Sequence, residues 1–144
     1  MSPETSDDQD ARSGGTRHPA ITAASLLFVV LGASWLLTYG YVLLYVASNR
    51  DLPIIFGFRP GAGRIYDVFG RDGAIVGLGL FAAVWALSIL AGFWLWKSRR
   101  KGAILGAITI ALGPIFWYGF GLPIPPLIAA LQLGLIAAGW RSLG

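Results

Sequence analysis

The sequence of 144 residues contains no cysteine, a single histidine and few charged side chains. Without cysteine, the chain forms no disulfide, no thiolate metal site and no cysteine nucleophile. The histidine, His18, lies in a polar N-terminal stretch and has no second histidine with which to share a metal ion. We therefore expect no metal and no cofactor.

Charged residues are scarce in this chain. Only 12% of the residues are charged and 56% are hydrophobic, whereas soluble domains have about 25% charged and about 45–50% apolar residues. This composition excludes an ordinary water-soluble domain and also excludes disorder along the whole chain. The length suits one domain, and the remaining class is an integral membrane protein.

The charges leave three long gaps, at 19–48, 73–96 and 102–140. A helix needs about 20 apolar residues to cross a hydrocarbon core of about 30 Å, so the first two gaps each predict one span. A single helix over the third gap would be about 58 Å long. Its middle, residues 119–126, holds two glycines and three prolines, which break helices. The third gap therefore predicts two helices joined by a tight turn.

The predicted fold is all-α: a polytopic membrane protein with four transmembrane helices in an up-down bundle and an interfacial outer loop. The predicted units are a mobile polar tail over 1–18 and a transmembrane domain over 19–144, with helices at about 20–47, 73–96, 102–119 and 124–140. A signal peptide is the alternative for the first span. The net acidic region before it and its long apolar run favour a retained helix.

Orientation follows from a cluster of positive charges between the second and third predicted spans. Lys97, Arg99, Arg100 and Lys101 fall within five residues, and such loops face the cytoplasm. Four spans then place the N-terminus and the C-terminus in the cytoplasm. Arginine far exceeds lysine, and glycine and alanine are frequent, which is typical of a GC-rich prokaryotic genome. We expect a multi-pass protein of a prokaryotic cell (inner) membrane.

No Asp, Glu, Lys, Arg or His lies inside a predicted span. Proton relays, voltage sensors and most ion-coupled transporters need such groups within the membrane, and so does catalysis there. The one strongly polar side chain near mid-membrane is Gln132. An interhelical hydrogen bond is its expected role, and a polar contact to a small ligand is the alternative.

Small residues recur at four-residue spacing in three predicted helices, where they allow helix backbones to approach closely. They are Gly73, Gly77, Gly102, Gly106, Ala130, Gly134 and Ala138. The pattern predicts helix packing within the chain. A face for a partner subunit or for a second copy is the alternative.

The outer segment 49–72 is the longest charged stretch between predicted spans. Its apolar piece 52–58 is too short to span and suits the headgroup boundary or a cap on the bundle. Ile65, Val68 and Phe69 follow a helical spacing that predicts a turn or two of amphipathic helix. The charges of the segment are typical of a solvated, partly paired loop, with an anionic-headgroup site as the alternative.

Seven basic side chains are the candidates for contacts with lipid headgroups or a partner. They are Arg59, Arg64, Arg71, Lys97, Arg99, Arg100 and Lys101. Nucleic-acid binding is excluded, because no exposed basic domain lies outside the spans. The expected partners are the lipid bilayer and another membrane protein or a second copy of the chain.

Three functions are compatible with this pattern. The leading hypothesis is a non-enzymatic structural or accessory component of a membrane complex or homo-oligomer. The alternative is a carrier or binder of lipid or of a small apolar solute, with residues 49–72 as an outer lid. A membrane enzyme is the third, because Asp51, Asp67 and Asp72 of the outer segment are the only acids between predicted spans. The sequence predicts no catalytic residue.

Overall fold

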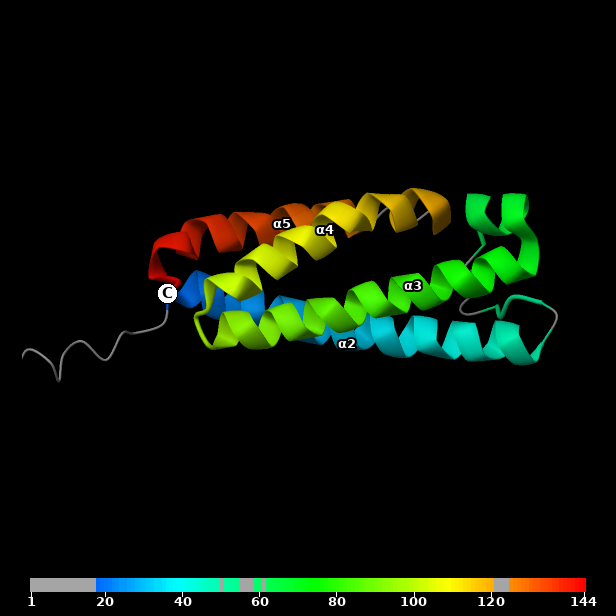
Figure 1. Cartoon of the computed structure of the whole chain (residues 1–144), viewed down its shortest axis with the longest axis horizontal. Helices are drawn as coiled ribbons and strands as arrows, with labels where there is room; N and C mark the ends of the chain where they lie inside the picture. The colour runs from blue at the N-terminus through cyan, green and yellow to red at the C-terminus, as the bar shows by residue number, and fades with distance from the viewer. Residues whose placement is uncertain (1–17, 50, 55–58, 61, 121–124) are drawn as a thin grey trace, which may run out of the picture.

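The computed structural model describes residues 18–49, 51–54, 59–60, 62–120 and 125–144. They form the helices α2 (Pro19–Ser48), α3 (Arg64–Trp96), α4 (Arg100–Phe120) and α5 (Pro125–Gly139), followed by the 3-10 turn η2 (Trp140–Ser142) (Figure 1). The predicted all-α class is confirmed. The predicted mobile tail, apart from His18, lies outside the described residues, as do residues 55–58 of the apolar outer piece.

Three of the helices are long and apolar enough to cross a membrane. They are α2, α3 and α4, with mean hydropathies of 2.1, 2.3 and 1.7 over their most apolar windows. The helix α5 has 15 residues, which corresponds to about 22 Å, and the hydrocarbon core is about 30 Å thick. The chain is therefore compatible with a membrane-embedded protein, while a fourth span remains a prediction.

The helix α2 begins and ends within one residue of its predicted limits of 20–47. At its start, the Nδ1 atom of His18 accepts a hydrogen bond of 3.3 Å from the backbone N–H of Ala20. Pro19 occupies the first helical position, where its missing N–H costs no hydrogen bond. At its end, the backbone N–H of Asn49 donates to the carbonyl oxygen of Tyr45 at 2.7 Å.

The helix α3 begins nine residues before its predicted start at 73, because a short helix precedes it. Gly70 has φ 63° and ψ −158°, so the chain turns sharply there. We call the short helical segment before this turn, residues 64–69, the hook (Figure 1). A positive φ is open to glycine at little cost. Residues 64–69 are therefore helical, as Ile65, Val68 and Phe69 predicted, but they are folded back against the main part of α3. A Cβ atom on Gly73 would collide with Phe69.

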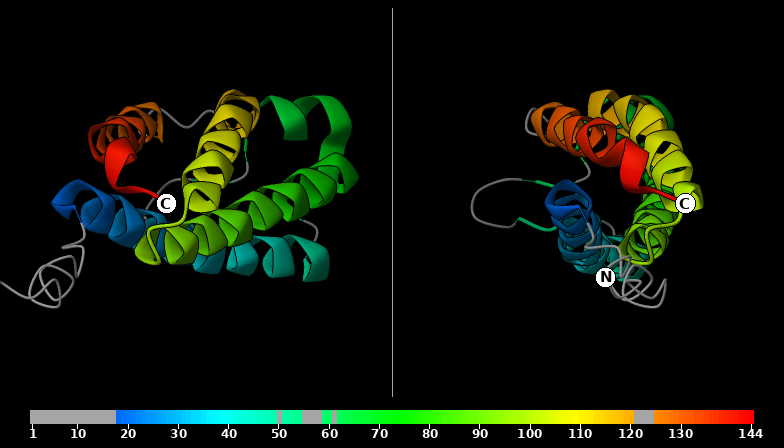
Figure 2. Two further views of the ribbon diagram at one scale, coloured as in Figure 1. Left: turned by 60° about the vertical axis from the view of Figure 1, so that its left-hand side comes forward. Right: turned by 90° about the vertical axis from the view of Figure 1, so that its left-hand side faces the viewer.

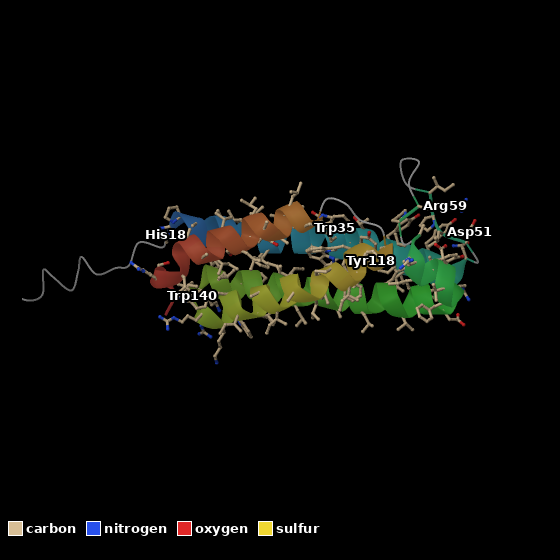
Figure 3. All side chains as sticks on the ribbon, turned by 90° about the horizontal axis from the view of Figure 1, so that it is seen from above. His18, Trp35, Asp51, Arg59, Tyr118 and Trp140 are labelled. Carbon is tan, nitrogen blue, oxygen red and sulfur yellow. The ribbon has the colours of Figure 1, made fainter. Side chains whose placement is uncertain are left out.

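Charged side chains of the described residues gather at the two ends of the molecule (Figure 3). We call one the basic end; it carries Lys97, Arg99, Arg100, Lys101 and Arg141. We call the other the mixed end; it carries Asp51, Arg59, Arg64, Asp67, Arg71 and Asp72. In Figure 3, His18 and Trp140 mark the basic end, and Asp51 and Arg59 mark the mixed end.

The buried apolar side chains form two clusters along the helices. The basic-end cluster joins all four helices and the C-terminal segment, and consists of Ile21, Ala24, Phe28, Ala91, Leu95, Ala103, Ile136 and Leu143. The mixed-end cluster joins α2, α3, α4 and the outer segment, and consists of Tyr39, Val42, Val46, Leu52, Leu78, Phe81, Phe116 and Phe120. Aromatic contacts fill the second cluster: the rings of Tyr39 and Phe81 meet edge to face, with centroids 4.8 Å apart.

The helix α5 packs beside α4 and against α2 (Figures 1 and 2). Its contact with α2 is close near the basic end, where a Cβ atom on Gly139 would collide with Ile21. Beyond η2 the chain meets the turn between α3 and α4, since the backbone N–H of Gly144 donates to the carbonyl oxygen of Ser98 at 3.0 Å. The chain after α4 therefore returns to the end at which α4 begins.

Candidate functional site

Four polar side chains are buried in the helices: Ser25, Ser88, Thr109 and Gln132. Two of them have a backbone partner. Ser25 Oγ donates to the carbonyl oxygen of Gly92 on the neighbouring helix, and Thr109 Oγ1 donates to that of Gly106 on its own helix, both at 2.8 Å. Gln132 is 4% exposed, and its amide Nε2 has no hydrogen-bond partner among the described residues.

Gln132 lines a small cavity to which all four helices contribute. The cavity has a volume of about 20 Å³. Phe28 comes from α2, and α3 contributes Trp85 and Ser88. From α4 come Thr109, Ile110, Gly113 and Trp117, and α5 supplies Gln132. Phe28 belongs to the basic-end cluster and Trp85 packs against the mixed-end cluster. The cavity therefore lies between the two clusters.

The indole of Trp85 brings a second unpartnered donor to this cavity. Its Nε1 is buried and makes no hydrogen bond within the described part of the chain. The ring itself is held by its neighbours, with Trp35 stacked at a centroid distance of 5.9 Å and Phe81 edge-on at 5.7 Å. Buried polar groups in native proteins nearly always have a partner, and a buried donor without one costs about 1–3 kcal/mol. Trp85 and Gln132 each carry such a donor, and both residues line the cavity.

Two glycines of α4 make room for aromatic side chains that line the cavity. At Gly113 a Cβ atom would collide with the indole of Trp117, so the absence of a side chain lets that ring lie against α4. At Gly106 a Cβ atom would lie 2.8 Å from Cζ of Phe28. Gly106 therefore allows Phe28 of α2 to pack closely against α4.

The structure places the seven candidate basic residues in two groups. Three make hydrogen bonds within the chain: Arg64 Nη1 donates to Tyr118 Oη, Arg71 donates to two carbonyl oxygens at the end of α2, and Arg100 Nε donates to Leu143 O. The other four are exposed and make no side-chain hydrogen bond among the described residues: Arg59, Lys97, Arg99 and Lys101. The structure brings none of the seven to the cavity.

The seven small residues also lie in different surroundings. A Cβ atom on Gly77 would lie 3.3 Å from Ile65 and from Phe120, and one on Gly102 would lie 2.8 Å from Ala91 O. A Cβ atom on Gly73 would collide with Phe69, and one on Gly106 would lie 2.8 Å from Phe28. The three on α5 differ: Ala130, Gly134 and Ala138 are exposed, and no atom lies within 4 Å of a Cβ atom built on Gly134.

Sequence reasoning overlooked two features that shape this region. It did not single out Trp85, although tryptophan usually gathers at membrane interfaces and this one lies near the middle of a predicted span. It also passed over Gly92, which follows Ser88 at the spacing of small residues. A Cβ atom on Gly92 would lie 2.7 Å from Val29 on α2.

The cavity offers hydrogen bonding and no acid–base chemistry. No charged side chain lines it. Within the described ranges, no three His, Cys, Asp or Glu side chains come together as metal ligands would. The acids Asp51, Asp67 and Asp72 are exposed at the mixed end, and Asp51 Oδ1 accepts a hydrogen bond from the neighbouring backbone N–H of Leu52.

Comparison with known protein families, with curated proteins and with solved structures finds no match to this chain.

Proposed function

We propose that the chain is a four-span protein of a prokaryotic cell membrane and acts as a non-enzymatic component that associates with a second copy or with another membrane protein. The return of the chain supports the fourth span. Arg100 opens α4, and its backbone N–H donates to the carbonyl oxygen of Gly144 at 3.0 Å. If α4 crosses the membrane, the segment that follows it crosses back. The helix α5 and η2 together provide about 28 Å for this crossing.

The distribution of charge supports an orientation with the basic end in the cytoplasm. Five Lys and Arg side chains lie at the basic end without a described acid, whereas three Arg and three Asp side chains lie at the mixed end. Cytoplasmic loops carry an excess of positive charge, and tryptophan favours the interface. Trp96 and Trp140 are both partly exposed at the basic end. In this orientation the N-terminus and the C-terminus both face the cytoplasm, and the mixed end faces the outside.

The outer face of α5 is the observation on which the proposed association depends. Ala130, Gly134 and Ala138 recur there at four-residue spacing and are exposed. Leu127 and Leu131 beside them are 76% and 54% exposed. Within a bilayer, helices associate by close backbone approach at small residues, because lipid chains are as apolar as leucine. A second helix could approach α5 closely along this face.

A pair of matched glycine variants tests the association. Gly134→Ile fills the proposed contact face, and Gly79→Ile adds the same side chain to α3, where a Cβ atom built on the glycine would meet nothing within 4 Å. Both positions are open, so we expect both variants to fold. Crosslinking in native membranes and the mass of the protein in a mild detergent should show an assembly for the wild type and Gly79→Ile, and its loss for Gly134→Ile. A wild-type monomer without a co-purifying chain would contradict the proposal.

The cavity favours a second candidate, a binder of a small lipid-soluble molecule. Two residues that line it, Trp85 and Gln132, carry buried donors without partners among the described residues, in surroundings that are otherwise mostly apolar. None of the described residues of the outer segment, which the sequence suggests as a lid for this function, lines the cavity. Addition of a ketone to the protein, with a matched alkane as control, tests this candidate at the cavity.

A further inference from the structure

The two unpartnered groups at the cavity belong to different helices and call for the same kind of partner. Trp85 Nε1 on α3 and Gln132 Nε2 on α5 are both buried and lack a hydrogen bond among the described residues. An indole N–H can only donate, and an amide nitrogen also donates. A group that satisfies both must therefore be an acceptor. An oxygen atom with two lone pairs can accept two hydrogen bonds.

The surroundings restrict the acceptor further. The cavity lining contains no charged side chain, and an anion without a partner is costly inside a membrane. The acceptor is therefore neutral. A cavity needs about 10–15 Å³ to hold one water molecule, and this one has about 20 Å³. It holds a single oxygen and is too small for a ring or a headgroup.

We propose that the cavity bounded by Trp85 and Gln132 binds one neutral acceptor oxygen, supplied either by a water molecule or by the carbonyl group of a lipid-soluble compound. In the second case only the oxygen enters the cavity, and the rest of the compound lies among the surrounding apolar side chains and lipid. The binding of a carbonyl oxygen rests on the second candidate function. The binding of a water molecule is independent of that function.

Nuclear magnetic resonance of the full chain in phospholipid nanodiscs tests the proposal. The indole N–H signal of Trp85 is identified by its disappearance in Trp85→Phe. In the wild type, a nuclear Overhauser effect between this proton and water is expected if water is bound. In a separate arm, 2-dodecanone is added, with n-dodecane as the matched compound that lacks an acceptor. A saturable shift of the Trp85 signal with the ketone and none with the alkane is expected if a carbonyl oxygen enters.

Variants distinguish the cavity from other parts of the protein. Gln132→Leu removes one donor at similar volume, and about fivefold more ketone should then be needed for half-saturation, as expected for the loss of one hydrogen bond. Trp140→Phe changes a partly exposed tryptophan at the basic end and should leave the response of Trp85 unchanged. The water and ketone measurements are made on the wild-type protein. They therefore test the proposal even if the Gln132→Leu protein fails to fold.

Each outcome has a definite meaning. A water signal without a ketone response establishes the oxygen site and removes the ligand-binding candidate function. A ketone response supports both. The absence of a water signal, together with either no saturable ketone shift or an equal shift with n-dodecane, overturns the inference. None of these results bears on the association proposed for the outer face of α5.

Discussion

Arg71 holds the C-terminal end of α2 through its contact with Ala47. The Nη2 atom of Arg71 donates to the carbonyl oxygen of Ala47 at 2.7 Å, and its Nε donates to that of Val46 at 3.1 Å. The last carbonyls of a helix have no partner within the helix and carry its partial negative charge. One side chain of α3 therefore satisfies two such groups and ties the start of the second long helix to the end of the first.

Loss of this contact should lower the stability of the protein. We expect Arg71→Met to reduce the free energy of unfolding by about 1–2 kcal/mol, because hydrogen bonds to charged groups are among the stronger ones and this site is only partly buried. Arg59→Met is the control, as Arg59 is exposed at the same end and makes no side-chain hydrogen bond among the described residues. Circular dichroism during titration with sodium dodecyl sulfate in mixed micelles measures both. Equal losses in the two variants would show that only the charge matters.

A second contact fastens the hook to α4. Arg64 Nη1 donates to Tyr118 Oη at 2.9 Å, and the guanidinium carbon lies 5.4 Å from the centre of the Tyr118 ring. Tyr118→Phe removes the hydrogen bond and keeps the cation–π contact, so we expect a loss of about 0.5 kcal/mol. Tyr118→Leu removes both and should cost about 1 kcal/mol. Faster amide hydrogen exchange over 65–69, graded in this order, would report the effect locally. Identical exchange in all three proteins would show that the contact does not hold the hook.

The pair Ser25 and Gly92 controls how closely α2 approaches α3. Ser25 Oγ donates to Gly92 O at 2.8 Å, and a Cβ atom on Gly92 would lie 3.0 Å from Ser25 O and 2.7 Å from a Val29 methyl group. Gly92→Ala must push the backbones apart, and we expect it to cost about 1–3 kcal/mol. Gly79→Ala on the same helix meets nothing within 4 Å and should be neutral or slightly stabilising. Thermal unfolding in detergent compares the two, and an undiminished Tm for Gly92→Ala would refute the packing argument.

The sequence predicted the apolar helices well because the reason for them is simple. Spans follow from the absence of charge over a fixed length, and α2, α3 and α4 agree with three predicted spans apart from the early start of α3. The hook before that start was harder to foresee. It depends on one backbone conformation, the positive φ of Gly70. A glycine in a sequence does not indicate which of its allowed backbone conformations it adopts.

The candidate site could be predicted only in part. The sequence marked Gln132 as the one strongly polar group in a span, but it could not show that Trp85 from another helix lines the same cavity. That juxtaposition depends on the rotation of α3 and α5 about their axes, which small residues and aromatic packing decide. For the same reason, a four-residue spacing does not distinguish Gly106, which contacts Phe28, from Gly134, which is open.

Arg100 should behave differently from its basic neighbours. Its side chain and backbone N–H both bond the last two residues of the described chain, Leu143 O and Gly144 O, at 3.0 Å. Arg100→Gln removes the side-chain bond and keeps the backbone bond, so it should loosen the C-terminal segment and lower Tm. Lys97→Gln combined with Lys101→Gln removes exposed charge and should instead weaken retention of anionic phospholipid during purification, by about 1 kcal/mol per charge. Lipid mass spectrometry and thermal unfolding separate the two effects. If all substitutions acted alike on both readouts, Arg100 would have no distinct structural role.

The proposed topology predicts which introduced cysteines a maleimide can label. Because the sequence contains no cysteine, the reagent reacts only with the introduced thiol. Single cysteines introduced as Asn49→Cys, Ser98→Cys and Ser142→Cys are each the only thiol in the chain. With α5 as a fourth span, three crossings separate position 49 from position 142. A membrane-impermeant maleimide added to intact cells should then label Asn49→Cys and label Ser142→Cys only after permeabilisation. Ser98→Cys is the control, since it lies one crossing from position 49 in either case and should be protected. Labelling of both Asn49→Cys and Ser142→Cys in intact cells would mean that α5 does not cross, and the protein would have three spans with its C-terminus outside.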